Sequence, residues 1–260
     1  MSLHILSTRV DTFSKQDVRH LLESWLLKGG QHHIVTLNPE MVMWAQKDSE
    51  FLALINNSSL TTVDGAGLVL ATRLISGTRP SRYTGYDLFH DLLFIAERDS
   101  KSVFFLGGKD QHVAYRAAQR LKVQFPLLRV AGAASGPHIL LEDTRIVIDA
   151  DEQAFLLSYI NEVKPDVIFV AFGHPKQEKW IAAALSRLPT VKIAVGVGGV
   201  FDYVSGSIRR APSWVRALGL EWFFRLLKQP WRFPRILTAT VKFSIAVLRE
   251  RSTLKRPGNT

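Results

Sequence analysis

The chain has 260 residues, 47% of them apolar and 22% charged, which predicts a packed globular core and excludes a disordered chain. It has no cysteine, so disulfide frameworks, thiolate zinc sites and cysteine nucleophiles are excluded. The net charge of +10 lies in residues 209–260, where twelve Lys and Arg accompany two acids, whereas residues 1–208 are neutral. This asymmetry predicts an anionic partner for the C-terminal part, either nucleic acid or anionic lipid.

Short apolar runs alternate with amphipathic segments over the first 200 residues. Residues 3–7 and 15–27 form the first predicted strand–helix unit, at an edge of the sheet. The other predicted strands are residues 33–37, 60–63, 102–106, 127–131, 166–171 and 191–197. The helices between them are predicted at residues 39–56, 66–74, 86–98, 111–125, 151–162 and 175–186. This alternation predicts an α/β fold, a Rossmann-like parallel sheet flanked by helices.

The strand–helix rhythm stops near residues 205–212, where arginine, tryptophan and proline take over. We therefore divide the chain into a Rossmann-like core, residues 1–208, and a basic, aromatic-rich, helical C-terminal appendage, residues 209–260. Arginine mixed with tryptophan and phenylalanine suits a membrane interface, and it equally suits stacking on single-stranded nucleic acid. No apolar run reaches the ~18 residues of a transmembrane helix, and no signal peptide is visible, so we expect a cytoplasmic protein.

Small and polar residues follow several predicted strands. In a parallel α/β sheet the ligand crevice lies outside the carboxyl ends of the strands, so these residues should converge on one site. Asp64, in the segment 64–67 (DGAG), either caps the next helix or acts as a general base, and its position alone favours the cap. Asn38 is likewise a natural N-cap, or it donates hydrogen bonds to a nucleotide together with Thr36.

Two further strand ends allow both a structural and a functional interpretation. Residues 173–178 (GHPKQE) begin a helix, whose N-terminus with Lys176 and Gln177 is suited to a phosphate. Residues 196–202 (GVGGVFD) form a tight glycine turn, or they contact a nucleotide through the backbone, with Asp202 on the ribose or base.

One acidic pair resembles a metal motif. Asp149 and Asp151 form the Asp-x-Asp pattern that holds a divalent metal in many glycosyltransferases. They also directly precede a predicted helix, where acids are ordinary caps. The capping interpretation is favoured.

Four segments together carry a resemblance to a known family. They are residues 82–87 (RYTGYD), 173–178 (GHPKQE), 210–212 (RAP) and 221–225 (EWFFR). In this order and spacing the chain resembles the WecG/TagA/CpsF family, glycosyltransferase family 26, from about residue 36 to residue 235.

The resemblance implies an enzyme that uses a UDP-sugar and inverts the anomeric centre without a metal or other cofactor. The implied acceptor is a polyprenyl-diphosphate-linked saccharide in cell-surface polysaccharide biosynthesis. The enzyme would lie peripherally on the inner face of the bacterial cytoplasmic membrane, with the appendage on anionic lipid. N-acetylmannosamine, its uronic acid and glucose all occur as donor sugars in the family.

The resemblance also assigns roles to individual residues. Asp64 matches the proposed catalytic base, and Arg82 lies near the pocket. The positions near the nucleotide and diphosphate are Thr36, Asn38, Gln177 and Asp202. The appendage arginines that would close over the site are Arg225, Arg232 and Arg235.

Two other functions remain in view at this point. The pI near 10 suits a nucleic-acid-binding α/β protein that uses the basic appendage, but the neutral core and its glycine-rich strand ends favour a small ligand. A dinucleotide-dependent oxidoreductase is disfavoured, because no complete G-x-G-x-x-G follows the first strand. The sequence leaves the oligomeric state open, a homo-oligomer included.

Overall fold

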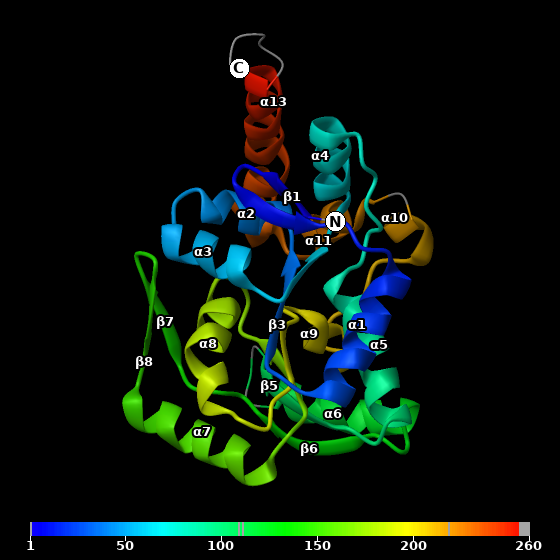
Figure 1. Ribbon diagram of the computed structural model, residues 1–260, viewed down its shortest axis with the longest axis vertical. Helices are drawn as coiled ribbons and strands as arrows, with labels where there is room; N and C mark the ends of the chain where they lie inside the picture. The colour runs from blue at the N-terminus through cyan, green and yellow to red at the C-terminus, as the bar shows by residue number, and fades with distance from the viewer. Residues whose placement is uncertain (1, 109, 111, 218, 255–260) are drawn as a thin grey trace.

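The computed structural model describes residues 2–108, 110, 112–217 and 219–254. Its centre is a six-stranded sheet in which every strand pairing is parallel (Figure 1). In sheet order the strands are β4 (Leu60–Val63), β3 (His32–Leu37), β10 (Ile193–Gly196), β9 (Val167–Ala171), β5 (Ser102–Gly107) and β6 (Arg129–Ala134). Six of the seven predicted strands belong to this sheet, which confirms the Rossmann-like α/β fold.

Helices cover both faces of the sheet because successive strand side chains point to opposite sides. Phe105 and Phe169 pack on one side, against α1 (Lys15–Lys28), α5 (Gly85–Arg98), α6 (Val113–Gln124) and α9 (Val200–Val204). Phe104 and Ile168 pack on the other, against α7 (Ala150–Val163) and α8 (Lys176–Ala184). A hairpin that the sequence did not predict, β7 (Ile139–Glu142) with β8 (Arg145–Ile148), leads into α7.

The N-terminal segment differs from its prediction as an edge strand of the main sheet. β1 (Ser2–Ile5) turns back into β2 (Thr8–Asp11), and the two form a separate antiparallel sheet. Leu6 and Ser7 both have positive φ, of 49° and 61°, as the two central residues of a tight hairpin turn require. The hairpin lies against β4, where the Asp11 amide donates to Thr61 Oγ1 at 2.9 Å.

The single helix predicted for residues 39–56 is two helices, α2 (Pro39–Ala45) and α3 (Ser49–Asn57). Asp48 causes the break, because its side chain caps α3 by accepting from the Phe51 amide at 2.9 Å. The same carboxylate lies 3.0 Å from Lys179 Nζ of α8, and both side chains are buried. An N-cap and a buried ion pair thus fix the position at which the second helix begins.

The appendage consists of short helices and one longer final helix. They are α10 (Ser213–Ala217), α11 (Glu221–Lys228), a 3₁₀ turn η2 (Pro230–Arg232), α12 (Phe233–Leu237), a π-helical turn η3 (Thr238–Lys242) and α13 (Phe243–Leu254). The last helix rises beside α4 (Ala66–Ser76), as Figure 1 shows. Its Phe243 and Val247 are buried in a core cluster with α2 and α4. The Leu6 N–H donates to both carboxylate oxygens of Glu250, at 2.9 and 3.1 Å.

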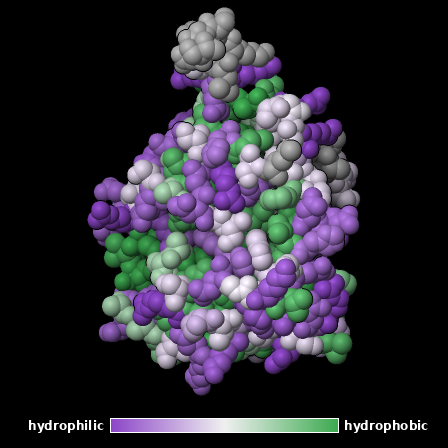
Figure 2. Space-filling model, in the orientation of Figure 1, coloured by the Kyte–Doolittle hydropathy of each residue, from purple (hydrophilic) through white to green (hydrophobic). Residues whose placement is uncertain are grey.

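Large apolar side chains remain exposed on the appendage. They include Trp214, Trp222, Leu227, Trp231, Phe233, Ile245 and Leu248. In Figure 2 apolar and hydrophilic patches both occur on the surface directly below the grey atoms at the top of the view. Within the described part of the chain, no helix has both the length and the apolar character needed to cross a bilayer.

Candidate active site

The loops after four adjacent strands meet at the carboxyl edge of the sheet, as predicted. Three cavities open there, and Asp64 lines all of them. The strand-end cavity is lined by the loops after β3, β9 and β10, including Asn38, Gly173 and Gly198. The appendage cavity lies between the core and Trp222 and Ile236 of the appendage. The arginine cavity is lined by Tyr86, Tyr203, Arg210 and Glu221.

Asp64 is not the helix cap that its position favoured. The N-cap of α4 is Gly65, which has a φ of 106° and makes no side-chain hydrogen bond. Asp64 Oδ2 instead accepts from the amide of Gly85, the first residue of α5, at 3.3 Å. Its half-buried carboxylate therefore lies at the junction of the three cavities and is held by the start of a second helix.

Thr36 and Asn38 both line the strand-end cavity, and both also have a structural contact. Thr36 Oγ1 donates to the carbonyl oxygen of Gly196 at 2.9 Å, which joins the ends of β3 and β10. Asn38 caps α2 by accepting from the Met41 amide at 3.1 Å. The two interpretations of Asn38 are therefore compatible, since a side chain that caps a helix also faces the cavity.

Gln177 connects two of the loops around the strand-end cavity. Its Oε1 accepts from the amides of Gly173, at 3.2 Å, and Gly198, at 3.0 Å, while its Nε2 donates to Glu178 Oε1 at 2.7 Å. Burial raises the pKa of Glu178, which is fully buried. Gln177 thus holds the loops in place, whichever ligand lies beyond them.

Two predicted phosphate and nucleotide contacts have other surroundings. The ammonium group of Lys176 donates to the carbonyl oxygen of Ile139 in the β7–β8 hairpin, and Lys176 lines none of the three cavities. Asp202 is 4% exposed in α9 and is also absent from their linings, which its neighbour Tyr203 joins. A contact between Asp202 and a nucleotide stays a prediction.

Arg235 extends from α12 to the strand-end and appendage cavities. Its Nε donates to Glu40 Oε1 at 2.6 Å, and its Nη2 lies 3.3 Å from His174 Nε2. Burial raises the pKa of Glu40, but hydrogen bonds and charges from His174 and Arg235 outweigh it and lower the pKa to about 2. Glu40 is therefore ionised at neutral pH and holds an appendage arginine beside the core cavity.

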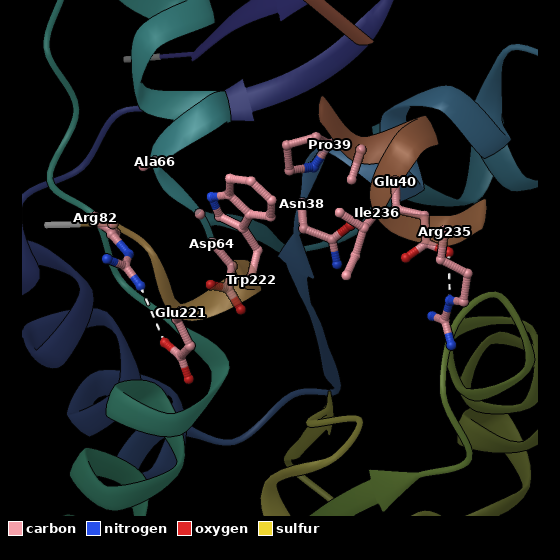
Figure 3. A pocket seen from close by; sticks show the side chains of 13 residues that line it. Asn38, Pro39, Glu40, Asp64, Ala66, Arg82, Glu221, Trp222, Arg235 and Ile236 are labelled. Carbon is pink, nitrogen blue, oxygen red and sulfur yellow. Dashed lines mark hydrogen bonds and ion pairs between the residues drawn. The ribbon is translucent and has the colours of Figure 1, made fainter. Parts of the chain in front are cut away.

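A second pair lies on the opposite side of Asp64 (Figure 3). Arg82 Nη2 donates to Glu221 Oε2 at 3.4 Å, and Arg210 Nε lies 3.6 Å from Glu221 Oε1. Figure 3 shows Asp64 and Trp222 between this pair and the Glu40–Arg235 pair. Arg82 thus lines the pocket as the resemblance implied. Each pair joins a core residue to an appendage residue.

Arg225 lies within α11 and Arg232 ends the η2 turn. The side chains of both lie outside the described part of the structure, so their roles stay predictions.

A profile of the Glycosyl transferase WecG/TagA/CpsF family matches residues 3–257. The chain belongs to this family. It is also similar to curated proteins named N-acetylglucosaminyldiphosphoundecaprenol N-acetyl-beta-D-mannosaminyltransferase. The protein from Bacillus spizizenii is 36% identical over 251 residues, 96% of this chain and 92% of the relative. The protein from Bacillus subtilis is 35% identical over 85% of this chain and 81% of the relative. The protein from Staphylococcus aureus strain MRSA252 is 32% identical over 86% of this chain and 82% of the relative.

The cavities of this glycosyl transferase family member also contain residues that were not predicted as site residues from the sequence. Glu40, His174, Arg210 and Glu221 line the cavities around Asp64. His174, Arg210 and Glu221 lie inside motifs that carried the resemblance, and Glu40 lies in the first turn of α2, three positions after β3. Their signal was present in the sequence, but pairing an acid near the N-terminus with an appendage arginine 195 positions later requires the fold.

The Asp-x-Asp pattern is a helix cap in this family member. Asp149 Oδ1 accepts from the amides of Asp151 and Glu152, both at 3.0 Å, and its side chain is exposed at the start of α7. Neither aspartate lines the three cavities. Among the described residues, no group of three or more His, Asp and Glu side chains is arranged to hold a metal ion.

Proposed function

We propose that this enzyme transfers N-acetylmannosamine from its UDP conjugate to N-acetylglucosamine on a polyprenyl diphosphate, with inversion at the anomeric carbon. The identity of both sugars is supported by the names of the relatives, which the chain matches over most of their length. The observation that carries the reaction itself is the position of Asp64, at the meeting point of three cavities and between two arginine pairs.

In the proposed mechanism Asp64 accepts the proton of the acceptor hydroxyl as its oxygen attacks the anomeric carbon. The bond from that carbon to the β-phosphate oxygen breaks on the opposite face, and UDP leaves. A positioned base of this kind contributes about 10²–10⁴-fold. Charge that develops on the diphosphate needs donors aimed at it, and Arg235, with Arg225 and Arg232, would supply them without a metal.

The strand-end cavity is the proposed nucleotide site. Thr36, Asn38 and Gln177 surround it, the loops there carry glycines, and Arg235 reaches it from the appendage. The appendage cavity, with Trp222 and Ile236 on one wall, offers the apolar surface expected beside a lipid-linked acceptor.

We further propose that the appendage lies on the cytoplasmic face of an anionic membrane. It carries the whole net charge, and its tryptophans are exposed. Each basic residue near an anionic surface adds about 1 kcal/mol within a Debye length. Because a polyprenyl-linked acceptor cannot leave the bilayer, the active site must come to it.

The test is a donor panel with a synthetic polyprenyl-diphosphate N-acetylglucosamine acceptor in anionic vesicles. UDP-N-acetylmannosamine should be used at least about tenfold better than the UDP conjugates of glucose and N-acetylmannosaminuronic acid, a difference of about 1.4 kcal/mol. Preference for another donor would refute the sugar assignment. A chain that binds oligonucleotides with a steep salt dependence, and transfers no sugar, would instead support the nucleic-acid alternative.

A further inference from the structure

The arginine cavity contains an arginine that the proposed mechanism does not use. The guanidinium carbon of Arg210 lies 3.7 Å from the centroid of the Tyr86 ring, so the side chain is held flat against an aromatic face. Its Nε atom is buried and has no hydrogen-bond partner among the described residues. A buried guanidinium N–H without an acceptor is costly, and an anionic ligand is the group that would remove this cost.

The Glu221 carboxylate forms an ion pair with this arginine, but the pair is long. Its two oxygens lie 3.6 Å from Arg210 Nε and 3.4 Å from Arg82 Nη2. Charge-assisted hydrogen bonds between such groups are typically about 2.7–2.9 Å long. The carboxylate therefore lies within the field of two arginines without forming a close hydrogen bond to the buried Nε of Arg210.

The position of Glu221 in the chain supports the same conclusion. The appendage carries only two acids, and the other one, Glu250, is engaged with the Leu6 amide. Glu221 begins α11, lines both the arginine and the appendage cavities, and lies on one side of Asp64. The negative charge of Glu221 thus lies where the negatively charged group of a substrate that reacts at Asp64 would bind.

We propose that Arg210 and Arg82 form a diphosphate subsite beside Asp64, and that the Glu221 carboxylate occupies it until a diphosphate displaces it. This inference rests on the proposed function, because a diphosphate is the anionic group that a UDP-sugar and a polyprenyl-linked acceptor share. A diphosphate offers several oxygens that the planar fork of Arg210 binds in pairs, and one of them satisfies the buried Nε.

The test is calorimetric titration of inorganic pyrophosphate into the full-length protein and its variants. Arg210→Gln should weaken binding by about tenfold or more, because hydrogen bonds to charged groups contribute about 1.5–3 kcal/mol. The matched control is Arg209→Gln, the same change of charge at the exposed neighbouring position, which should leave affinity within about twofold. Glu221→Gln should tighten binding by about threefold or more, because a competing charge is removed.

The same titration with saturating UDP identifies which diphosphate the subsite serves. If UDP abolishes the Arg210-dependent binding, the subsite holds the donor diphosphate. If UDP leaves it unchanged, the subsite holds the acceptor diphosphate.

Equal affinities of the Arg210→Gln and Arg209→Gln proteins, or no tightening in Glu221→Gln, would overturn the inference. Arg210→Lys, which keeps the charge and loses the fork, should show an intermediate loss and covers the case in which the glutamine variant does not fold. Wild-type protein that binds pyrophosphate through Arg210 but fails to bind UDP would refute the proposed function and leave the anion subsite standing.

Discussion

The core and the appendage treat their apolar side chains in opposite ways. In the core, Phe89, Phe105 and Phe169 are fully buried and contact one another between the sheet and its helices. In the appendage, Trp214 and Trp231 are 65% and 70% exposed. Buried aromatics stabilise a fold, whereas exposed tryptophans among arginines fit the membrane contact that we propose for the appendage. The core thus supplies the strand ends that form the cavities, and the appendage supplies exposed aromatic surface next to them.

Charge follows the same division. The core is neutral, and a buried cation such as Lys179 lies between two acids, Asp48 and Glu50. The two acids of the appendage both face the core, Glu221 toward Arg82 and Glu250 toward Leu6. The appendage thus uses its negative charges for attachment to the core, and its excess of positive charge is what the proposed anionic membrane contact requires.

The largest expected effect lies in the core. Asp64→Asn should keep the fold and UDP binding while turnover falls by about 10²–10⁴-fold, because the amide cannot accept the acceptor proton. Asp149→Asn is the matched control, since Asp149 is an exposed helix cap outside the cavities. Turnover in Asp64→Asn equal to that of the control would remove Asp64 from the chemistry.

The next effect sharpens the role of the appendage. Arg225→Ala and Arg232→Ala should each lower turnover by about tenfold or more, while binding to anionic vesicles weakens only by the loss of one charge, about 1 kcal/mol. Turnover and vesicle sedimentation are measured on the same proteins. Equal losses in both measurements would mean that these arginines serve only the membrane.

Replacing exposed aromatic side chains of the appendage should weaken membrane binding and leave nucleotide binding unchanged. The double change Trp231→Ser and Phe233→Ser should weaken vesicle binding by about tenfold or more and leave UDP affinity unchanged, because both side chains are solvent-exposed and apolar. Removing the whole appendage is a less selective test, since it also removes Phe243 and Val247 from a core cluster. Unchanged sedimentation of the double variant would place the membrane contact elsewhere.

The Glu40–Arg235 pair predicts a pH-dependent contribution to the joint between the two regions. The pKa of Glu40 is lowered from 4.5 to about 2, so its pairing stabilises the protein above about pH 4.5 and is lost as the pH falls through about 2. Glu40→Gln should therefore reduce the free energy of unfolding at pH 7 by about 1–3 kcal/mol, and by progressively less below pH 4.5. Urea denaturation at several pH values measures this.

The control for that experiment is Glu50→Gln, a change at an acid whose side chain is 71% exposed. Its effect on the free energy of unfolding should stay below about 1 kcal/mol. A Glu40→Gln protein that behaved in the same way would show that the pair contributes nothing to the joint.

Removal of divalent metal ions is the change for which we expect no effect on activity. Transfer should continue at an unchanged rate in EDTA, because arginines from both regions are proposed to neutralise the leaving diphosphate. Activity that EDTA abolishes and Mg²⁺ or Mn²⁺ restores would transfer that role from the appendage to a metal.

The sheet was predictable because its strands are short apolar runs, and the convergence of their carboxyl ends placed Thr36, Asn38 and Asp64 around common cavities. Local signals failed where tertiary contacts decide. The break before α3 depends on Asp48 pairing with Lys179 of another helix, and the N-terminal hairpin depends on two positive-φ residues that are not glycine. Asp64 appeared to be a cap because Gly65 behind it offers no side chain of its own.

Contacts between residues far apart in the chain could not be predicted from sequence patterns. Glu40 and Arg235 each have an ordinary sequence context, and only the path of the appendage across the carboxyl edge brings them together. Arg210 stacks on Tyr86 for the same reason.

The contact between Glu250 and the Leu6 amide joins residues 244 positions apart. The ribosome adds Glu250 to the chain 244 residues after Leu6, so the N-terminal hairpin gains this partner long after it has been synthesised. The core has time to fold before α13 docks beside the hairpin. A chain that stopped short of residue 250 would leave Leu6 without its acceptor and Phe243 and Val247 without full support.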